Sequence, residues 1–146
     1  MECSSLNALI NQVVPNGVAI VVAAGNSNVN ASNTSPASAE TAITVGAISE
    51  DDKKAWFSNW GPALDIFAPG ENIHSAWIPG NKDYKTNGGT SMASPFVAGV
   101  AAYLIAKQGL TTTAAVTESV IGLGTTGLVT ELNGSPNVML YNGGGA

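Results

Sequence analysis

The amino-acid sequence predicts an α/β fold with a mostly parallel sheet. Residues 18–24 (VAIVVAA) are apolar without polar alternation, which is typical of a strand covered on both faces in a parallel sheet. Residues 91–108 instead repeat apolar side chains at helical spacing. Strands mixed with helices in a chain of 146 residues indicate a layered α/β domain, or a large part of one.

The first expected helix covers residues 4–14, whose apolar side chains have helical spacing, with Ser4 or Ser5 as the N-cap. Pro15-Asn16-Gly17 ends this helix and leads into the apolar strand. The polar residues 25–38 are expected to form a loop, and a loop of this length in a compact domain is usually functional.

Three further strands are expected in the middle of the chain, at residues 42–48, 64–67 and 73–78. Residues 49–62 hold most of the charge of this region together with several aromatic side chains, so they are expected to form a surface loop. Ala68-Pro69-Gly70 is expected to stop the strand before it. The remaining elements, in order, are a loop at 79–90, a helix at 91–108 ended by Gly109, a helix at 113–121, and one or two strands within 128–141 that turn at Asn133-Gly134.

The composition excludes several classes of protein. The net charge is −5 and no Lys/Arg cluster occurs, which argues against binding to nucleic acid or to an anionic membrane surface. Outside the helix at 91–108, the longest apolar run is the one at 18–24, whereas a membrane-spanning helix needs about 20 residues. We therefore expect no nucleic-acid partner and no membrane span.

The low charge content indicates either a mostly buried chain or a piece of a larger one, whose missing part covers apolar surface. Charged residues make up 10% of the chain, against about 25% in an average globular protein, so much of the surface is expected to be covered. The chain starts within the first helix and offers few helices for two faces of a sheet, so we expect a missing N-terminal portion. The first residues show no secretion-signal pattern, and the single Cys3 forms no internal disulfide.

Asn26 and Ser91 are candidate functional residues because both are expected at one edge of the sheet. Asn26 follows the strand at 18–24, and Ser91 begins the helix at 91–108. In open α/β sheets, the carboxyl ends of strands and the N-termini of helices meet at the edge where ligands bind. A serine hydroxyl, a helix N-terminal N–H and a carboxamide donor are parts of an acyl-transfer site.

Each of these residues also has a simpler interpretation. Ser91 can be only a helix cap, and Gly25-Asn26 only a turn. The Gly-x-Ser-x-Gly elbow of α/β-hydrolases is absent, because Ala93 stands where that motif needs glycine, and no Gly-x4-Gly-Lys-Ser/Thr phosphate loop occurs. The spacing alone leaves both interpretations open.

Two long segments, Val21-Val-Ala-Ala-Gly-Asn26 and Gly89-Thr-Ser-Met-Ala-Ser-Pro95 with Val97-Ala-Gly99, occur in order with several shorter motifs. The shorter motifs are Ser35-Pro-Ala-Ser38, Thr44-Val-Gly46, Phe57-Ser-Asn59, Leu64-Asp-Ile-Phe67 and Ala68-Pro-Gly70. Together they resemble the subtilisin-like serine proteases, specifically the proteinase K-like branch common in fungi. The resemblance implies a three-layer subtilisin-like fold, with residues 1–146 as the C-terminal part of a single catalytic domain.

The resemblance implies roles for five residues. Ser91 matches the catalytic nucleophile, and Asn26 matches the asparagine whose side chain helps to form the oxyanion hole. Ala23, Ala24 and Gly25 match one wall of the primary specificity pocket. The resemblance further implies polypeptide substrates and a secreted or vacuolar location.

A calcium site is also implied by the resemblance. The family's calcium site nearest to this region uses two backbone carbonyls and one carboxylate, which fall on Glu40, Ala42 and Asp65 here. Hard oxygen ligands suit calcium, and backbone carbonyls tolerate a change of side chain. Asp65 can alternatively be a solvated or capping carboxylate at a strand edge.

One departure from the family pattern bears on activity. The aspartate and histidine that activate the serine precede the matching segment in family members, so the upstream half of the domain is an expected partner. The only histidine, His74, aligns with a strand of no catalytic role and is expected to be structural, and Phe96 replaces a non-catalytic histidine of many relatives.

Two hypotheses follow. Either the chain is half of a serine endopeptidase, inactive by itself, or it is an inactive remnant that acts at most as a binding or antigenic module.

Overall fold

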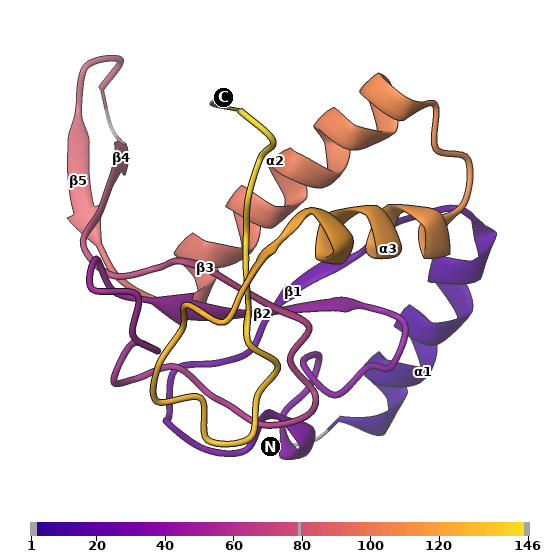
Figure 1. Ribbon diagram of the computed structural model, residues 1–146, viewed down its shortest axis with the longest axis horizontal. Helices are drawn as coiled ribbons and strands as arrows, with labels where there is room; N and C mark the ends of the chain where they lie inside the picture. Colours follow the sequence, from indigo (N-terminus) through magenta and orange to yellow (C-terminus); the bar gives the residue numbers. More distant parts are fainter. Residues whose placement is uncertain (1–2, 79, 145–146) are drawn as a thin grey trace.

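A five-stranded sheet lies at the centre of the fold (Figure 1). The computed structural model describes residues 3–78 and 80–144. In spatial order the strands are β1 (Val21–Ala23), β2 (Ile43–Ile48), β3 (Ile66–Pro69), β7 (Val138–Met139) and β6 (Thr125–Thr126). The first four are parallel to one another, and only β6 is antiparallel to its neighbour β7. The predicted α/β class with a mostly parallel sheet is confirmed.

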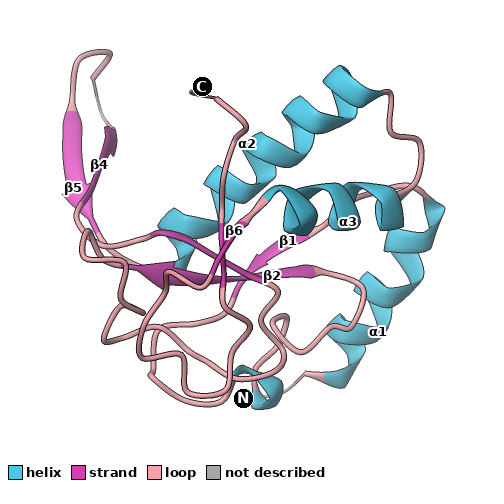
Figure 2. Ribbon diagram, in the orientation of Figure 1, coloured by secondary structure: helices cyan, strands magenta, loops and turns pink. Residues whose placement is uncertain are grey.

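Helices on both faces of the sheet give the fold three layers (Figure 2). Helices α2 and α3 share one face, and α1 packs against β1 from the other. The helical segments are α1 (Ser4–Val13), the 3-10 turns η1 (Val14–Asn16) and η2 (Ala31–Asn33), α2 (Thr90–Gln108) and α3 (Thr113–Leu123). Within the described ranges, none of them combines the length and hydropathy that crossing a bilayer requires.

An antiparallel hairpin stands apart from the main sheet. It consists of β4 (Ile73–Ala76) and β5 (Tyr84–Asn87), and it projects from the body of the fold next to the start of α2 (Figure 1). The sequence predicts a loop at 79–90, of which residue 79 lies outside the described residues. That prediction is wrong for residues 84–87, because they pair with β4.

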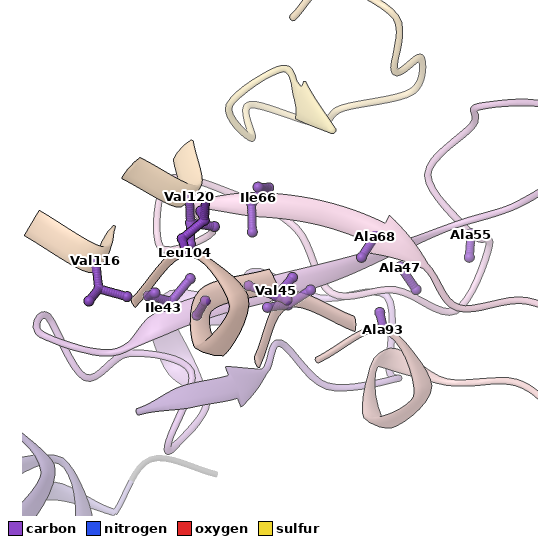
Figure 3. Close-up of a cluster of buried hydrophobic side chains, with 12 residues drawn as sticks. Ile43, Val45, Ala47, Ala55, Ile66, Ala68, Ala93, Leu104, Val116 and Val120 are labelled. Atoms are coloured by element: carbon purple, nitrogen blue, oxygen red, sulfur yellow. The ribbon is translucent and has the colours of Figure 1, made fainter. Parts of the chain in front are cut away.

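The main core fills the space between the sheet and helices α2 and α3 (Figure 3). Side chains alternate along a strand, so Ile43, Val45 and Ala47 share the face of β2 that meets α2. The helices contribute Ala93, Val97, Ala101, Leu104, Val116 and Val120. Small side chains on both sides let α2 lie close to the strands.

Strand β2 is buried on both faces. On the face away from α2, a Cβ at Gly46 would stand 2.5 Å from a ring carbon of Phe67 and 2.6 Å from a methyl carbon of Leu64, so only glycine fits. The expected strand at 18–24 differs from its prediction, because only Val21–Ala23 pair with β2 and Val18 is 52% exposed. Within the described sheet, β1 is an edge strand rather than a fully covered one.

Several boundaries also differ from the sequence prediction. The N-cap of α1 is Cys3, without a side-chain hydrogen bond, rather than Ser4 or Ser5. Strand β3 continues through Ala68 to Pro69, since these residues pair with the end of β2. The C-cap of α2 is Gly109 with φ of 67°, as predicted.

Residues 49–62 are not a simple surface loop. Lys54, Ala55, Ser58 and Asn59 are buried, whereas Trp56 is 75% exposed. The Ser58 and Asn59 side chains bind backbone groups of Ala47 and Ala24 outside this segment, which local composition does not reveal.

Candidate active site

Hydrogen bonds around Thr90 join the end of β1 to the start of α2. The Thr90 backbone N–H and hydroxyl donate to Asn26 Oδ1, at 2.8 and 2.9 Å. The Thr90 hydroxyl oxygen accepts from the Gly25 N–H at 3.1 Å. Thr90 is fully buried, whereas Asn26 is exposed, so these bonds are part-buried. The structure thus brings Asn26 to the first turn of α2, although 64 residues separate Asn26 from Thr90.

Two N–H donors at this edge have no partner among the described residues. Thr90 occupies the amide oxygen of Asn26, which leaves Nδ2 free, 3.3 Å from the place where a Cβ on Gly89 would stand. In the first turn of α2, the two N–H groups after Ser91 donate to the Gly89 carbonyl, but no acceptor is found for the Ser91 N–H in the described ranges. A helix N-terminus also carries partial positive charge. An anion beside the exposed Ser91 hydroxyl would therefore be stabilised.

The three residues of the expected specificity wall continue β1 directly into Asn26. Ala23 is the last residue of β1, and the Ala24 N–H still donates to the Val45 carbonyl at 3.0 Å. The Ala24 side chain is buried, whereas Ala23 and Gly25 are half-buried. The wall shares the rigidity of the sheet, because its backbone remains bound to β2.

His74 lies on β4, away from these donors. Its ring stacks on Tyr84 with 5.3 Å between centroids, and its Nδ1 lies 3.3 Å from Thr86 Oγ1. Its neighbours Ile73 and Ser75 line a groove of about 390 Å³ that also contains Ser91. Because side chains alternate along a strand, His74 faces away from that groove. This placement agrees with the structural role expected from the sequence.

The expected calcium ligands, Glu40, Ala42 and Asp65, border one cavity of about 230 Å³. Asp65 Oδ2 accepts from the Thr44 N–H at 2.7 Å. Burial raises the pKa of the Asp65 carboxyl, and the hydrogen bond from Thr44 opposes that rise only in part. No three His, Cys, Asp or Glu side chains gather in the part of the chain that is described, so a cation here would depend on backbone carbonyls.

Two residues of this region were missed by sequence reasoning. Thr90 directly precedes Ser91, and the signal that could have identified it is a threonine next to an expected helix start. Asn59 belongs to the motif Phe57-Ser-Asn59 but was assigned to a surface loop. The structure shows that Asn59 is 1% exposed and that its side chain binds the segment that carries Asn26.

Comparisons with known proteins identify the family and the fold of this chain. The family model described as "Subtilase family" matches residues 2–123. The chain is 50% identical to "Subtilisin-like protease 2" of Pseudogymnoascus destructans over 143 residues, which are 98% of this chain and 36% of that protein. It is 54% identical to an "Alkaline proteinase" of Hapsidospora chrysogena over 144 residues, again 98% and 36%. A crystal structure of a cold adapted subtilisin-like serine proteinase matches with a TM-score of 0.93 and 38% identity, covering 99% of this chain and 52% of that one.

The matching family model and relatives define the class of protein: a subtilisin-like protease of α/β architecture. More specifically, the chain belongs to the subtilase family of serine proteases, and it has the subtilisin-like fold predicted from its motifs. It spans about 36% of the length of the curated relatives that it matches.

Asp65→Asn should change how the free energy of unfolding depends on pH. The folded-state pKa of Asp65 is raised, so folding favours the protonated carboxyl. Its stabilising contribution is therefore complete below the ordinary value of 3.8 and is lost as the pH rises through the folded-state pKa. Urea unfolding in EDTA should show the variant gaining stability relative to the parent between pH 3 and pH 7. A difference that stays constant over this range would contradict the raised pKa.

Proposed function

We propose that this chain is the C-terminal part of a subtilisin-like endopeptidase domain and supplies the nucleophile and the oxyanion-binding half of its active site. Ser91 is the nucleophile, and the Asn26 amide and the Ser91 N–H bind the oxyanion. The observation that carries this proposal is the bond between Asn26 and Thr90, which brings Asn26 to the first turn of α2, where the Ser91 N–H and Asn26 Nδ2 have no partner among the described residues. Acyl transfer requires fixed donors at the place where negative charge develops.

The proposed reaction is hydrolysis of a peptide bond through an acyl-enzyme. Ser91 Oγ adds to the carbonyl carbon, and its proton passes to a general base. The carbonyl oxygen becomes an oxyanion and is held by Asn26 Nδ2 and the Ser91 N–H. The amine then leaves with the proton, and water releases the acyl group from Ser91. Ala23, Ala24 and Gly25 line one wall of the pocket that receives the substrate side chain.

The general base comes from the upstream half of the domain. The only histidine of this chain, His74, faces away from the groove that contains Ser91. The curated relatives are long enough to contain such a half, because this chain spans 36% of their length. The isolated chain therefore has a serine in position but no base to activate it, and we expect it to be inactive.

The exposed face of α2 is the surface on which the upstream half docks. A helix that is apolar all round is normally buried on every side. Only one side of α2 packs against the sheet, whereas Phe96, Tyr103 and Ile105 are between 38% and 48% exposed. Gly99 lies in the interior of this helix with no atom near the place of its missing Cβ. Glycine costs about 1 kcal/mol relative to alanine there, so its presence fits close approach by another segment.

The names of the relatives support a location and a branch within the family. The matched proteins include fungal alkaline and cuticle-degrading proteases. These names, with the motifs quoted above, support a proteinase K-like enzyme that is secreted or vacuolar and acts on polypeptides.

Structural calcium belongs to the same proposal. Asp65, Glu40 and Ala42 border one small cavity, and a carboxylate with two backbone carbonyls would supply the hard oxygen donors that calcium prefers. Calcium would neutralise a carboxylate whose burial is otherwise unfavourable. The ion would stabilise the loop before β2 and would take no part in the reaction.

Activity should appear when the upstream half is supplied. In a chimera, this chain replaces the matched segment of the Hapsidospora chrysogena alkaline proteinase. The chimera should hydrolyse a peptide substrate and react with a fluorophosphonate probe, and Ser91→Ala should abolish both. Asn26→Ala should lower kcat and leave KM nearly unchanged, because its donor acts on charge that develops in the transition state. The reference loss, about 10²–10³-fold in kcat, is the value known for subtilisin rather than one obtained from this structure.

Two controls accompany this experiment. His74→Ala should leave kcat unchanged, and the 146-residue chain alone should show neither labelling nor turnover. A folded chimera whose Ser91→Ala variant keeps full activity would contradict the assignment of the nucleophile. Labelling of the isolated chain at Ser91 would show that it contains its own base.

Calcium should raise the melting temperature of the chimera through Asp65. Asp65→Asn should reduce that rise, because the variant loses the only charged ligand of the site. Glu40→Gln is the matched control and should keep the full rise, since Glu40 binds through its backbone carbonyl. Calorimetry in EDTA and in millimolar calcium measures both. An equal calcium response of Asp65→Asn and the parent would refute this site.

Gly99→Ala should have opposite effects in the isolated chain and in the chimera. In the isolated chain the methyl group has open space and alanine favours the helix, so unfolding should cost about 0.5–1 kcal/mol more. In the chimera the docked half should leave no room, so the variant should lose about 1–3 kcal/mol. Gly122→Ala on α3, which also has open space, should stabilise both proteins. Urea unfolding tests this, and equal stabilisation by Gly99→Ala in both would exclude the docking face.

A further inference from the structure

Asn59 binds the segment that carries Asn26 on both sides of that residue. Its Nδ2 donates to the Ala24 carbonyl at 2.8 Å. Its Oδ1 accepts from the N–H groups of Ser27 and Val29, at 3.0 and 3.2 Å. One side chain therefore holds the backbone that enters Asn26 and the backbone that leaves it.

Gly25 fits against Asn59 closely enough to exclude any side chain. Its φ of 104° lies in the left-handed region, and a Cβ there would overlap the Asn59 amide. The Gly25 carbonyl accepts from the backbone N–H of Asn59 at 2.9 Å. The backbone conformation of Gly25 is thus fixed by its contact with Asn59, in addition to the hydrogen bond from its N–H to the Thr90 hydroxyl.

Asn59 is itself fixed to the sheet. It is 1% exposed, so its hydrogen bonds are shielded from water. Its carbonyl accepts from the Ser58 hydroxyl at 2.9 Å, and the same hydroxyl oxygen accepts from the Ala47 N–H of β2 at 3.0 Å. Asn59 is therefore held in place by β2 through the hydroxyl of Ser58.

Lys54 adds a second connection to the same segment. Its ammonium donates to Asn28 Oδ1 at 3.3 Å and to the Ala55 and Ser58 carbonyls at 3.3 and 3.4 Å. Burial lowers the pKa of Lys54, and the negative charge of Glu131 opposes this in part. Lys54 thus connects the side chain of Asn28 to the carbonyl of Ser58, the residue directly before Asn59.

We propose that Asn59 is a positioning residue of this active site, which directs the Asn26 amide by holding the backbone of residues 24–29. The inference rests on the proposed function, in which Asn26 Nδ2 binds the oxyanion. Thr90 fixes the amide oxygen of Asn26, and Asn59 fixes the main chain from which that side chain extends. Together, Thr90 and Asn59 fix the direction in which Asn26 Nδ2 points. Removing Asn59 frees three backbone groups, and misplacement of a catalytic group by about 1 Å can cost roughly 10²-fold in rate.

The test is a double-mutant cycle in the chimera, with kcat and KM for a peptide substrate as readouts. Asn59→Ala should lower kcat about 10–100-fold, and KM should change less than kcat. In the Asn26→Ala background, the same substitution should lower kcat by less than about 3-fold, because the donor that it orients is already gone. A general loss of folded structure would lower kcat equally in both backgrounds.

Asn137→Ala is the matched control. Asn137 also bridges backbone groups with its amide, donating to the Val129 carbonyl at 2.9 Å and accepting from the Val129 N–H at 3.0 Å. It lies in a different loop, so its loss should lower the melting temperature and leave kcat within about 2-fold of the parent. An equal fall of kcat in Asn137→Ala and Asn59→Ala would overturn the positioning role.

Asn59→Asp provides a second variant if the alanine variant does not fold. A neutral carboxyl in this place can still donate toward the Ala24 carbonyl and accept from Ser27, whereas a carboxylate cannot donate and repels that carbonyl. The ratio of variant to parent kcat should therefore fall as the pH rises. A ratio that does not depend on pH would contradict the proposal.

The two possible failures are distinguishable. An inactive parent chimera, or one in which Asn26→Ala keeps its full kcat, would refute the proposed function. An active chimera that depends on Asn26 but keeps its kcat in Asn59→Ala, or loses the same factor in both backgrounds, would refute only the role of Asn59.

Discussion

The close packing of helix α2 against the parallel strands is the constraint on which the rest of this structure depends. Alanines stand on both sides of this contact among larger apolar side chains, with Ala47 and Ala68 on the strands and Ala93 and Ala101 on the helix. This packing determines where α2 begins, and it begins close enough to β1 for Thr90 to bind Asn26. A larger side chain in the contact would displace the helix start as well as strain the core. Stability and site geometry therefore have one common origin.

Much of the architecture was predictable because it rests on local patterns. The apolar strand β2, the helix α2 and its glycine C-cap each leave a signal in consecutive residues. The meeting of Asn26 and Ser91 at one edge was predictable as well, since in a parallel sheet the carboxyl ends of strands and the starts of following helices fall on the same side. The roles of these residues came from motif resemblance, because a serine at a helix start and a Gly-Asn pair are common in proteins that do no chemistry.

What could not be predicted depends on contacts between distant segments. Residues 49–62 contain charges and aromatic rings, so they look exposed, yet Asn59 and Lys54 are buried. Backbone groups of residues 24–29 satisfy the Asn59 amide, and the Asn28 side chain accepts from Lys54. Nothing near Asn59 in the sequence shows that its partners lie 30 to 35 residues earlier. Strand β5 was missed for a related reason, since its residues are all exposed and polar or aromatic, and only pairing with β4 orders them.

Water at the exposed face of α2 also weakens the electric field around Ser91. The groove beside this serine opens to solvent, and a dielectric constant near 80 reduces the attraction between an anion and the N–H groups of Asn26 and Ser91. The same donors at the same distances act about four times more strongly where the effective dielectric constant is about 20. A partner that covers Phe96 and Tyr103 would therefore strengthen this site without moving any of its atoms. In a protein that contains both halves, their packing would determine the effective dielectric constant around Ser91.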